Sequence, residues 1–526
     1  MKRLIMTAMA MGLCCVLQAQ KPIIPDTVTA GQERVDEVMK LIDGNYVEGP
    51  DMDKMSTAAI NAMLKALDPH SIYIAAKDVE RANEGLQGNF EGVGISFQIV
   101  SDTIVVATVI EGGPSEKVGV MIGDKLLRID GIAATGDSIN NDFVFKHLRG
   151  KKGTTVVLDV QRGGEVYSFH IVRDKVPIYS IDTYFMADDS IGYIRLTRFA
   201  RSSVDEFRKA LKQLKKNGMT ALILDLRGNS GGFLDIANSL ANEFLERGQL
   251  IVYTEGRTSR RQNFRANGRG DWRQGRLAVL IDESSASASE IVSGAVQDWD
   301  RGTLVGRRSY GKGLVQRMFP LKDGGQIRLT TARYYTPSGR CIQRPYDEGT
   351  DAYRQDANNR YRHGELVNAD SIHFDDSLKY KTAGGRTVYG GGGIMPDVFV
   401  PLDTMRLTDY VISLRGKGLL NTMPMQWADQ HRRDARVKTF EDYLANYDSF
   451  GLDSLLTAEA LEKGVVRDTE KEASNPERTA HSEHYLKLLL KAQVARNLFG
   501  TEYYYKVMKE MDDGYLRAVE LLRGRR

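Results

Sequence analysis

The chain has 526 residues, of which 42% are hydrophobic and 27% are charged, and this composition excludes a disordered or fibrous protein. Its length is sufficient for two or three globular domains and for the core of an enzyme. The formal net charge is only +3, which gives no support to a nucleic-acid or polyanion partner.

Residues 1–19 have the pattern of a secretory signal peptide. Lys2 and Arg3 precede an apolar run, residues 4–17, that is too short to span a bilayer and is followed by the small residue Ala19. We therefore expect an exported protein, located in the periplasm or attached to the cell envelope, with no membrane span once the signal is removed. The alternative is that this segment forms a buried N-terminal helix.

The three cysteines bear on the compartment and on the kinds of site that are available. Cys14 and Cys15 leave open a lipoprotein anchor, although Leu13 rather than a small residue precedes the first of them. Removal of the signal leaves Cys341 as the single cysteine, which excludes an internal disulfide and a zinc site made of cysteines. We expect neither a metal ion nor a cofactor.

Hydrophobic patterning divides the rest of the chain into four regions, which we take as residues 20–87, 88–175, 176–402 and 403–526. The first has apolar residues at helical spacings, and the second has period-two alternation between glycine-rich turns, with one helix near residues 141–148. In the third, strands such as residues 221–226 alternate with helices such as residues 203–216, which is typical of an α/β core. The fourth is charged and helical in period.

Two features of the helical regions have more than one interpretation. Val35, Val38 and Ile42 form an apolar stripe that we expect to belong to a core, because such stripes are more often core than interface. The aromatic segment at residues 503–505 suits packing on the core, capping of a dimer or binding of an adaptor.

The β-rich region begins with Gly92-Val93-Gly94-Ile95, which places two glycines ahead of an apolar strand. Consecutive backbone N–H groups can turn outward there into a nest for a carboxylate, while the strand edge can pair with an extended peptide. Together with the runs at residues 112–119 and 123–131, this segment resembles a bacterial PDZ domain. The alternative is a small barrel in which the glycines only form hairpin turns.

Ser230 is the first candidate nucleophile. It lies in a G-x-S-x-G turn, residues 228–232, between a predicted buried strand and a predicted helix, as in a nucleophile elbow. Such a serine needs a histidine and a carboxylate, and none of the later histidines, residues 363, 373, 431, 481 and 484, has a setting that marks it as catalytic. The alternative is that the glycines let the backbone approach a substrate and that Ser230 merely occupies a turn.

A serine cluster at residues 284–289 supplies the second candidate. It follows the predicted strand at residues 277–281 and begins a helix that we expect to end near Trp299. A helix N-terminus offers unpaired N–H groups and partial positive charge to a developing oxyanion. Taken alone, the cluster is equally well explained as a run of helix-capping residues.

Lys312 is flanked by Gly311 and Gly313 and then by apolar residues, so its amine is placed where it can lose contact with water. Desolvation favours the neutral amine, which is a competent base, but work near pH 7 requires its pKa to fall by roughly three units from about 10.4. Two alternatives are an ordinary surface lysine and a phosphate-binding loop. The loop lacks the usual motif, because Gly313 follows the lysine.

These motifs together resemble the signature of the C-terminal processing peptidases, also called tail-specific proteases. Other segments that occur in that family in the same order are residues 67–71, the PDZ-like region, and residues 225–229, 333–340 and 393–397. The resemblance covers roughly residues 35–402. It implies a multi-domain α+β fold with an N-terminal helical region, a PDZ domain, an α/β protease core of the ClpP/crotonase-like type and a C-terminal helical extension.

The resemblance also implies roles for individual residues. Ser287 would be the nucleophile, Lys312 the general base and Gln316 the residue that positions the lysine amine. The family spacing is kept, since Lys312 follows Ser287 by twenty-five residues and Gln316 follows the lysine by four. Gly231 or Gly232, with Ala288, would form the oxyanion hole.

One departure concerns Ser230, because relatives usually have proline or glycine at that position. This difference favours a turn residue over a nucleophile. We expect a serine endopeptidase that cleaves proteins near their C-terminal tails, and we keep two alternatives: an inert scaffold that binds tails, and a histidine-dependent hydrolase that uses Ser230.

The PDZ-like region would bind the tail carboxylate at Gly92, Val93, Gly94 and Ile95, and apolar Val93, Ile95 and Phe97 favour apolar tail residues. In the family this domain also gates the active site. Some relatives form dimers through the N-terminal helical region and some require an adaptor lipoprotein. A homodimer and such an adaptor are therefore candidate partners, besides the protein substrates.

Overall fold

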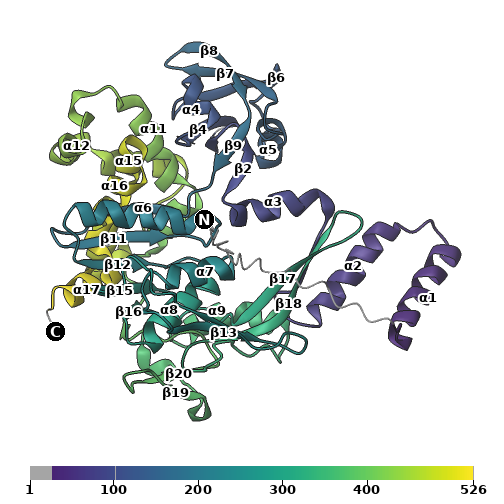
Figure 1. Ribbon diagram of the computed structural model, residues 1–526. Coiled ribbons are helices and arrows are strands. Elements are labelled where there is room, and N and C mark those ends of the chain that lie inside the picture. The colour runs from purple at the N-terminus through teal and green to yellow at the C-terminus, as the bar shows by residue number, and fades with distance from the viewer. Residues whose placement is uncertain (1–26, 101, 525–526) are drawn as a thin grey trace, which may run out of the picture.

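The computed structural model describes residues 27–100 and 102–524, so the predicted signal peptide and the alternative anchor at Cys14 or Cys15 lie outside the described residues. Within the described ranges, no helix has both the length and the apolar character that a membrane span requires. The fold is a multi-domain α+β arrangement, as predicted, and Figure 1 shows its parts.

The N-terminal helices α1 (Ala30–Asn45) and α2 (Met52–Lys65) form an arm (Figure 1). Helix α1 stands away from the rest of the chain, whereas the end of α2 contacts the core, where Lys65 pairs with Asp351 at 3.0 Å. The prediction that the apolar stripe on α1 belongs to a core is wrong. Val35 and Val38 are each 48% exposed, and α1 has no buried residue, because no other described element packs over it. Strand β1 (Ile72–Ile74) and helix α3 (Ala76–Gln87) then lead into the next region.

The β-rich region folds around its own sheet, with the strand order β3-β4-β5-β7-β8 and β6 paired to β5. Its strands are β3 (Ile95–Val100), β4 (Thr103–Val109), β5 (Lys125–Ile129), β6 (Ile132–Ala133), β7 (Thr155–Arg162) and β8 (Glu165–Val172), and its helices are α4 (Pro114–Val118) and α5 (Asn141–Leu148). Side chains such as Ile104, Leu126 and Leu158 are completely buried between sheet and helices. Strand β3 is at the edge of the sheet, so one side of it is free to pair.

Two short strands, β2 (Asn89–Gly92) and β9 (Asp174–Pro177), pair and join this region to the core. The core contains a six-stranded sheet in the order β10-β11-β12-β15-β16-β21, in which only β10 runs antiparallel to its neighbour. The strands are β10 (Ile181–Met186), β11 (Ile191–Leu196), β12 (Ala221–Asp225), β15 (Arg276–Ile281), β16 (Thr303–Gly306) and β21 (Val398–Phe399).

Helices cover both faces of this sheet, which explains why strand β12 is a continuous buried apolar run up to its final aspartate. On one face lie α6 (Ser203–Lys216), α7 (Leu234–Ala241) and α8 (Ala288–Asp298). On the other face lies α17 (Asp513–Leu522), the last helix of the chain. Helix α17 is therefore a structural layer of the core.

A second sheet lies beside the first and carries the lysine segment. Its order is β1-β18-β13-β14, with β17 paired to β18, and it contains β13 (Leu250–Glu255), β14 (Gln262–Arg265), β17 (Leu314–Pro320) and β18 (Gln326–Tyr335). The segment between β18 and β21 contains α9 (Thr350–Arg362) and a pair of short strands, β19 (Lys379–Lys381) and β20 (Thr387–Tyr389).

The C-terminal region forms a helical bundle with its own apolar core before it returns to the sheet through α17. Its helices are α10 (Asp409–Gly416), α11 (Leu419–His431), α12 (Phe440–Asn446), α13 (Leu452–Glu462), α14 (Thr469–Ser474), α15 (Pro476–Phe499) and α16 (Thr501–Met508). Of the three interpretations of the aromatic segment, the structure shows packing on the core, because the Tyr505 hydroxyl donates to Asp182 at 2.8 Å.

Candidate active site

Ser287 lies at the junction between the loop after β15 and the first turn of α8. Its backbone has φ of +56°, which is rare for a residue with a side chain and marks local strain of the kind found at functional sites. Gly231 packs directly against this junction. A Cβ atom added to Gly231 would lie 2.9 Å from the Cβ of Ser287 and 2.9 Å from the backbone nitrogen of Ala288, so only glycine fits.

One cavity of about 270 Å³ collects all of the residues that the sequence nominated for the nucleophile, the base and the oxyanion hole. Its lining includes Ser287, Lys312, Gln316, Gly231, Gly232 and Ala288. Leu86 of α3 and Leu314 and Met318 of β17 supply apolar walls. The loops that follow three different strands therefore converge on one space.

The Lys312 amine is held inside this cavity by a hydrogen bond to a neutral group. Its Nζ donates to Oε1 of Gln316 at 3.0 Å. Burial, helped by Arg328, lowers the pKa of Lys312 against the opposing effect of Asp68 and Glu290. In the described part of the chain, Lys312 has no ion pair, and no hydrogen bond joins its Nζ to Ser287.

Gln316 is itself oriented from the N-terminal part of the chain. Its Nε2 donates to the backbone carbonyl of His70, which leaves Oε1 to face the lysine. Asp68 fixes the turn that presents this carbonyl, because its Oδ1 accepts from the N–H groups of His70 and Ser71, each at 2.8 Å. Burial, with the nearby Lys312, lowers the pKa of His70 to about 4 although Asp68 opposes this, so the imidazole is neutral at pH 7.

Glu290 joins the serine loop to the lysine loop. Its carboxylate is completely buried and accepts from the Ser287 N–H at 2.8 Å, the Ser309 hydroxyl at 2.5 Å, the Gly311 N–H at 2.7 Å and the Lys312 N–H at 2.9 Å. Burial raises the pKa of Glu290, and these hydrogen bonds offset the effect only in part. Sequence reasoning missed this role, although a glutamate three residues after a serine at a helix start is the signature of a capping box.

Asn229 organises the glycine-rich turn on the other side of the cavity. Its Oδ1 accepts from the Gly231 N–H at 2.9 Å, so this donor of the predicted oxyanion hole is already engaged. Gly232 and Ala288 keep N–H groups that have no acceptor among residues 27–100 and 102–524. Of the predicted set, these two are the donors available to a developing oxyanion.

Comparisons with known proteins agree with this geometry. The model of peptidase family S41 matches residues 190–350, and that of the PDZ domain matches residues 92–172. A carboxy-terminal-processing protease of Bartonella bacilliformis is 36% identical over 345 residues, which are 62% of this chain and 78% of that protein. The chain belongs to the carboxy-terminal-processing protease family.

The chain spans less than two thirds of the length of several other curated relatives. A probable CtpA-like serine protease of Staphylococcus aureus (strain N315) is 33% identical over 318 residues, which are 60% of this chain and 63% of that relative. A solved photosystem II D1 C-terminal processing protease is 26% identical and covers 72% of this chain and 95% of its own, with a TM-score of 0.37. Residues 410–500 match a family of unknown function, DUF8443.

The predicted PDZ domain is confirmed, and most of its predicted carboxylate-binding segment lines a groove. Val93, Gly94 and Ile95 lie in a cavity of about 50 Å³ between β3 and α5. Gly92 does not line this cavity, because it ends β2 and pairs with Asp174 of β9. Arg149, which sequence reasoning did not single out, does line it.

Ser230 lines the cavity that contains Ser287 and Lys312, but the elbow alternative finds no histidine partner there. None of the described residues that line this cavity is a histidine. His481, one of the later histidines, bonds instead to Asp403 at 2.7 Å in the C-terminal region. The family resemblance and the geometry thus both favour a turn residue at this position.

Proposed function

We propose that this chain is a serine endopeptidase that cleaves proteins near their C-terminal tails, with Ser287 as the nucleophile and Lys312 as the general base. The observation that carries the proposal is the buried amine of Lys312, which shares one cavity with Ser287 and, among the residues that the structure describes, bonds to the side-chain amide of Gln316 alone. Membership of the carboxy-terminal-processing protease family supports it.

In the first step, Oγ of Ser287 forms a bond to the carbonyl carbon of the scissile peptide. Its proton passes to the neutral Nζ of Lys312, and the π electrons of the carbonyl move to its oxygen. The N–H groups of Gly232 and Ala288 stabilise this oxyanion, since Ala288 is the first residue of α8 and its N–H has no partner within that helix.

In the second step, the carbon–nitrogen bond breaks and the ammonium of Lys312 returns the proton to the leaving amine. The product is an ester of Ser287. Water then attacks the ester with Lys312 as the base, and protonation of Ser287 restores the enzyme.

Gln316 serves this cycle by positioning the amine. Because its Nε2 donates to the His70 carbonyl, its Oε1 must face Lys312, where it can accept a hydrogen bond from either the neutral or the protonated lysine. A neutral acceptor holds the amine without stabilising its charge as a carboxylate would.

The PDZ groove would hold the substrate tail. An extended tail can pair with the free edge of β3 while its carboxylate approaches Val93 to Ile95 and the guanidinium of Arg149. The apolar lining at Phe97 and Leu148 favours apolar tail residues. We expect tails ending in alanine or valine to be cleaved faster than tails ending in charged residues, and equal rates would refute this preference.

Helix α3 connects the groove to the cavity and supports gating of the site by the PDZ domain. Glu84 on this helix forms an ion pair with Arg149 of the groove, while Leu86 on the same helix lines the cavity of Ser287. A tail carboxylate that binds Arg149 would compete with Glu84 for this guanidinium. Loss of the Glu84 pair would let α3 shift, and Leu86 would move with it at the wall of the active site.

The test is to incubate tagged substrates that differ only in their tails with the wild type, Ser287→Ala and Lys312→Ala, and to map the cut sites by mass spectrometry. Ser284→Ala is the matched control, because Ser284 is an exposed neighbour in the same loop. We expect cleavage by the wild type and the control only. Tail binding without cleavage in every sample would favour the scaffold. Ser230→Ala is added as a further variant that should cleave like the wild type, and loss of cleavage in this variant alone would favour the histidine-dependent hydrolase.

We also propose export to the periplasm or the cell envelope and self-association through α1. The exposed apolar stripe at Val35 and Val38 fits a second copy of the same stripe. Val35→Glu with Val38→Glu should turn a dimer into a monomer in light scattering, and a monomeric wild type would refute the dimer.

An adaptor lipoprotein is the other partner that the family suggests, and affinity capture from envelope extracts tests for it.

A further inference from the structure

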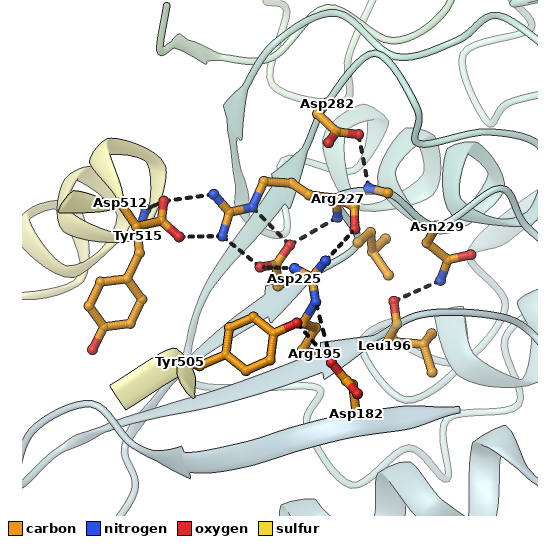
Figure 2. A network of polar contacts seen from close by, with 12 residues as sticks. Asp182, Arg195, Leu196, Asp225, Arg227, Asn229, Asp282, Tyr505, Asp512 and Tyr515 are labelled. Carbon is orange, nitrogen blue, oxygen red and sulfur yellow. Dashed lines mark hydrogen bonds and ion pairs between the residues drawn. The ribbon is translucent and has the colours of Figure 1, made fainter. Parts of the chain in front are cut away.

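Asp512 lies at the N-terminus of α17, outside residues 190–350 and 410–500 that match the protease and DUF8443 models. It reaches back across the core to Arg227, a contact between residues 285 positions apart (Figure 2). Its two carboxylate oxygens accept from Nη1 and Nη2 of Arg227, each at 2.7 Å. A bidentate pair of this kind fixes both the position and the plane of a guanidinium.

The opposite edge of the same guanidinium is bound by Asp225. Its Oδ1 accepts from Nε of Arg227 at 3.0 Å and its Oδ2 accepts from Nη2 at 2.6 Å. Arg227 is thus held between two carboxylates, one at the end of β12 and one at the start of α17 (Figure 2). Its side chain is only 19% exposed.

Arg227 leads directly into the turn that forms one wall of the active-site cavity. The Arg227 carbonyl accepts from Nη2 of Arg195 at 3.1 Å, and the next N–H, that of Gly228, donates to Asp282 at 3.0 Å. Gly231 and Gly232 complete the turn and line the cavity. The orientation of Arg227 therefore sets the start of the segment that presents the Gly232 N–H.

The turn is also bonded to the serine loop. The Asn229 carbonyl accepts from the Ala286 N–H at 3.0 Å and from the Ser289 hydroxyl at 2.8 Å, on both sides of Ser287. Asn229 in turn donates to the Leu196 carbonyl at 2.9 Å (Figure 2). A shift of the turn would be transmitted to the nucleophile through these bonds.

Helix α17 is a firm support for Asp512, because it is packed independently of this ion pair. Tyr515, Ala518, Val519 and Leu522 are buried against the second face of the central sheet. The Tyr515 ring also makes an edge contact with Tyr193, at 5.7 Å between centroids. A carboxylate on an anchored helix can hold a flexible guanidinium and a glycine-rich turn in place.

We propose that Asp512 is a positioning residue of the active site: through Arg227 it fixes the turn that presents the Gly232 N–H beside Ser287. The C-terminal region is then a clamp on the oxyanion-binding wall as well as a layer of the core. The inference rests on the proposed function for the roles of Ser287 and Gly232.

Asp512→Asn is the variant that isolates this effect. Asparagine caps a helix as well as aspartate does, so the bond from the Tyr515 N–H to Oδ1, 3.0 Å long, is retained and α17 stays capped. The variant removes the negative charge and one of the two acceptors that Arg227 uses. We expect kcat to fall about tenfold and KM to change less than about twofold, because a displaced oxyanion donor affects the transition state more than the bound substrate.

Arg523→Gln is the matched control. Arg523 lies beyond the other end of α17 and pairs with Asp188 at 2.8 Å, so this variant also removes one ion pair between the C-terminal segment and the core. It does not touch the turn. We expect its kcat to equal that of the wild type and its thermal stability to fall by no more than that of Asp512→Asn.

The experiment measures kcat, KM and amide hydrogen exchange over residues 226–233 for full-length wild type, Ser287→Ala, Asp512→Asn and Arg523→Gln. The inference predicts that Asp512→Asn alone combines faster exchange of the turn with a lowered but measurable kcat, whereas Ser287→Ala is inactive with a turn that exchanges as in the wild type, and Arg523→Gln equals the wild type in kcat and in exchange of the turn. Unchanged exchange, or equal changes in both ion-pair variants, would overturn it. Cleavage that persists in Ser287→Ala would overturn the proposed function instead, and the exchange data would still decide whether Asp512 holds the turn.

Discussion

Two completely buried carboxylates, Asp225 and Glu290, support opposite sides of the same cavity. They differ in the charge of the groups that donate hydrogen bonds to them. Asp225 bonds to the guanidinium groups of Arg195 and Arg227 and to the Tyr193 hydroxyl at 2.6 Å. Within residues 27–100 and 102–524, the donors to Glu290 are all neutral, namely three backbone N–H groups and one hydroxyl. One carboxylate belongs to an ionic network, and the other acts as a hydrogen-bonding hub for two loops.

The difference appears in the direction of each pKa. Burial opposes ionisation of Asp225, but the charges of Arg227 and Arg195 and the hydrogen bonds outweigh burial and hold its pKa below the usual range. Burial raises the pKa of Glu290, and neutral donors do not reverse this. Two equally buried carboxyl groups therefore have pKa values shifted in opposite directions. The difference comes from the charge of the groups that bond to them.

The largest effect is expected for Asp225→Asn. This change leaves Arg195 and Arg227 without their shared counter-charge in a buried site, and we expect the free energy of unfolding to fall by about 3–5 kcal/mol. Urea denaturation measures it. Asp235→Asn, which breaks the exposed pair with Arg201, is the control and should cost less than about 1 kcal/mol. Similar losses in the two variants would contradict an ionic role for Asp225.

A smaller loss of stability is expected for Glu290→Gln. The amide NH₂ cannot accept a hydrogen bond, so buried N–H groups lose their partner at a cost of about 1–3 kcal/mol, with no unpaired charge left behind. Cleavage should fall as well, because the backbones of Ser287 and Lys312 both bond to this carboxylate. Glu283→Gln, in the loop that precedes α8, breaks the pair with Arg307 and is the control. Glu290→Gln with full activity would show that Glu290 does not position the two loops.

The smallest effect is expected in how pH changes the free energy of unfolding that is lost in Asp225→Asn and in Glu290→Gln. It is also the sharpest test of the difference between the two carboxylates. Asp225 has a lowered pKa when folded, so its contribution is complete above about pH 3.9 and is lost as the pH falls further. Glu290 has a raised pKa when folded, so the penalty for its ionisation is absent below about pH 4.3 and grows as the pH rises. Relative to its amide variant, the wild type should lose stability on acidification at Asp225 and gain it at Glu290.

Urea denaturation of the wild type and both amide variants across this acidic range measures these differences. Because each variant is compared with the wild type at the same pH, the titration of groups that do not interact with the substituted residue cancels. The same sign of change at both positions would refute the distinction between an ionic and a neutral environment.

The parts of the site that could be predicted from sequence are those carried by short motifs. Ser287 and Lys312 follow β15 and β16 of the central sheet, and Gln316 lies in β17 of the second sheet. The family resemblance of their motifs, with the spacing kept, was sufficient to nominate them, and all three line one cavity. The helix at residues 141–148 and the α/β pattern of the core were also predicted, because local periodicity reports which face of an element is buried.

The parts that escaped prediction depend on contacts between distant segments. The His70 carbonyl meets Gln316 across 246 positions, and Asp512 meets Arg227 across 285, and no local pattern announces either pair. The prediction that Val35 and Val38 belong to a core was wrong for a different reason. The helical period of this stripe was real, but periodicity does not reveal whether another element covers the apolar face.

The central claim, that the buried amine of Lys312 activates Ser287, is tested most directly by covalent labelling with a fluorophosphonate probe as a function of pH. Wild type should be labelled at Ser287, with a rate that rises as the pH increases through a midpoint below the ordinary lysine value of about 10.4. Lys312→Met should be labelled at least about 100-fold more slowly at every pH. Equal rates in the two proteins, or labelling of Ser230 instead, would contradict the account.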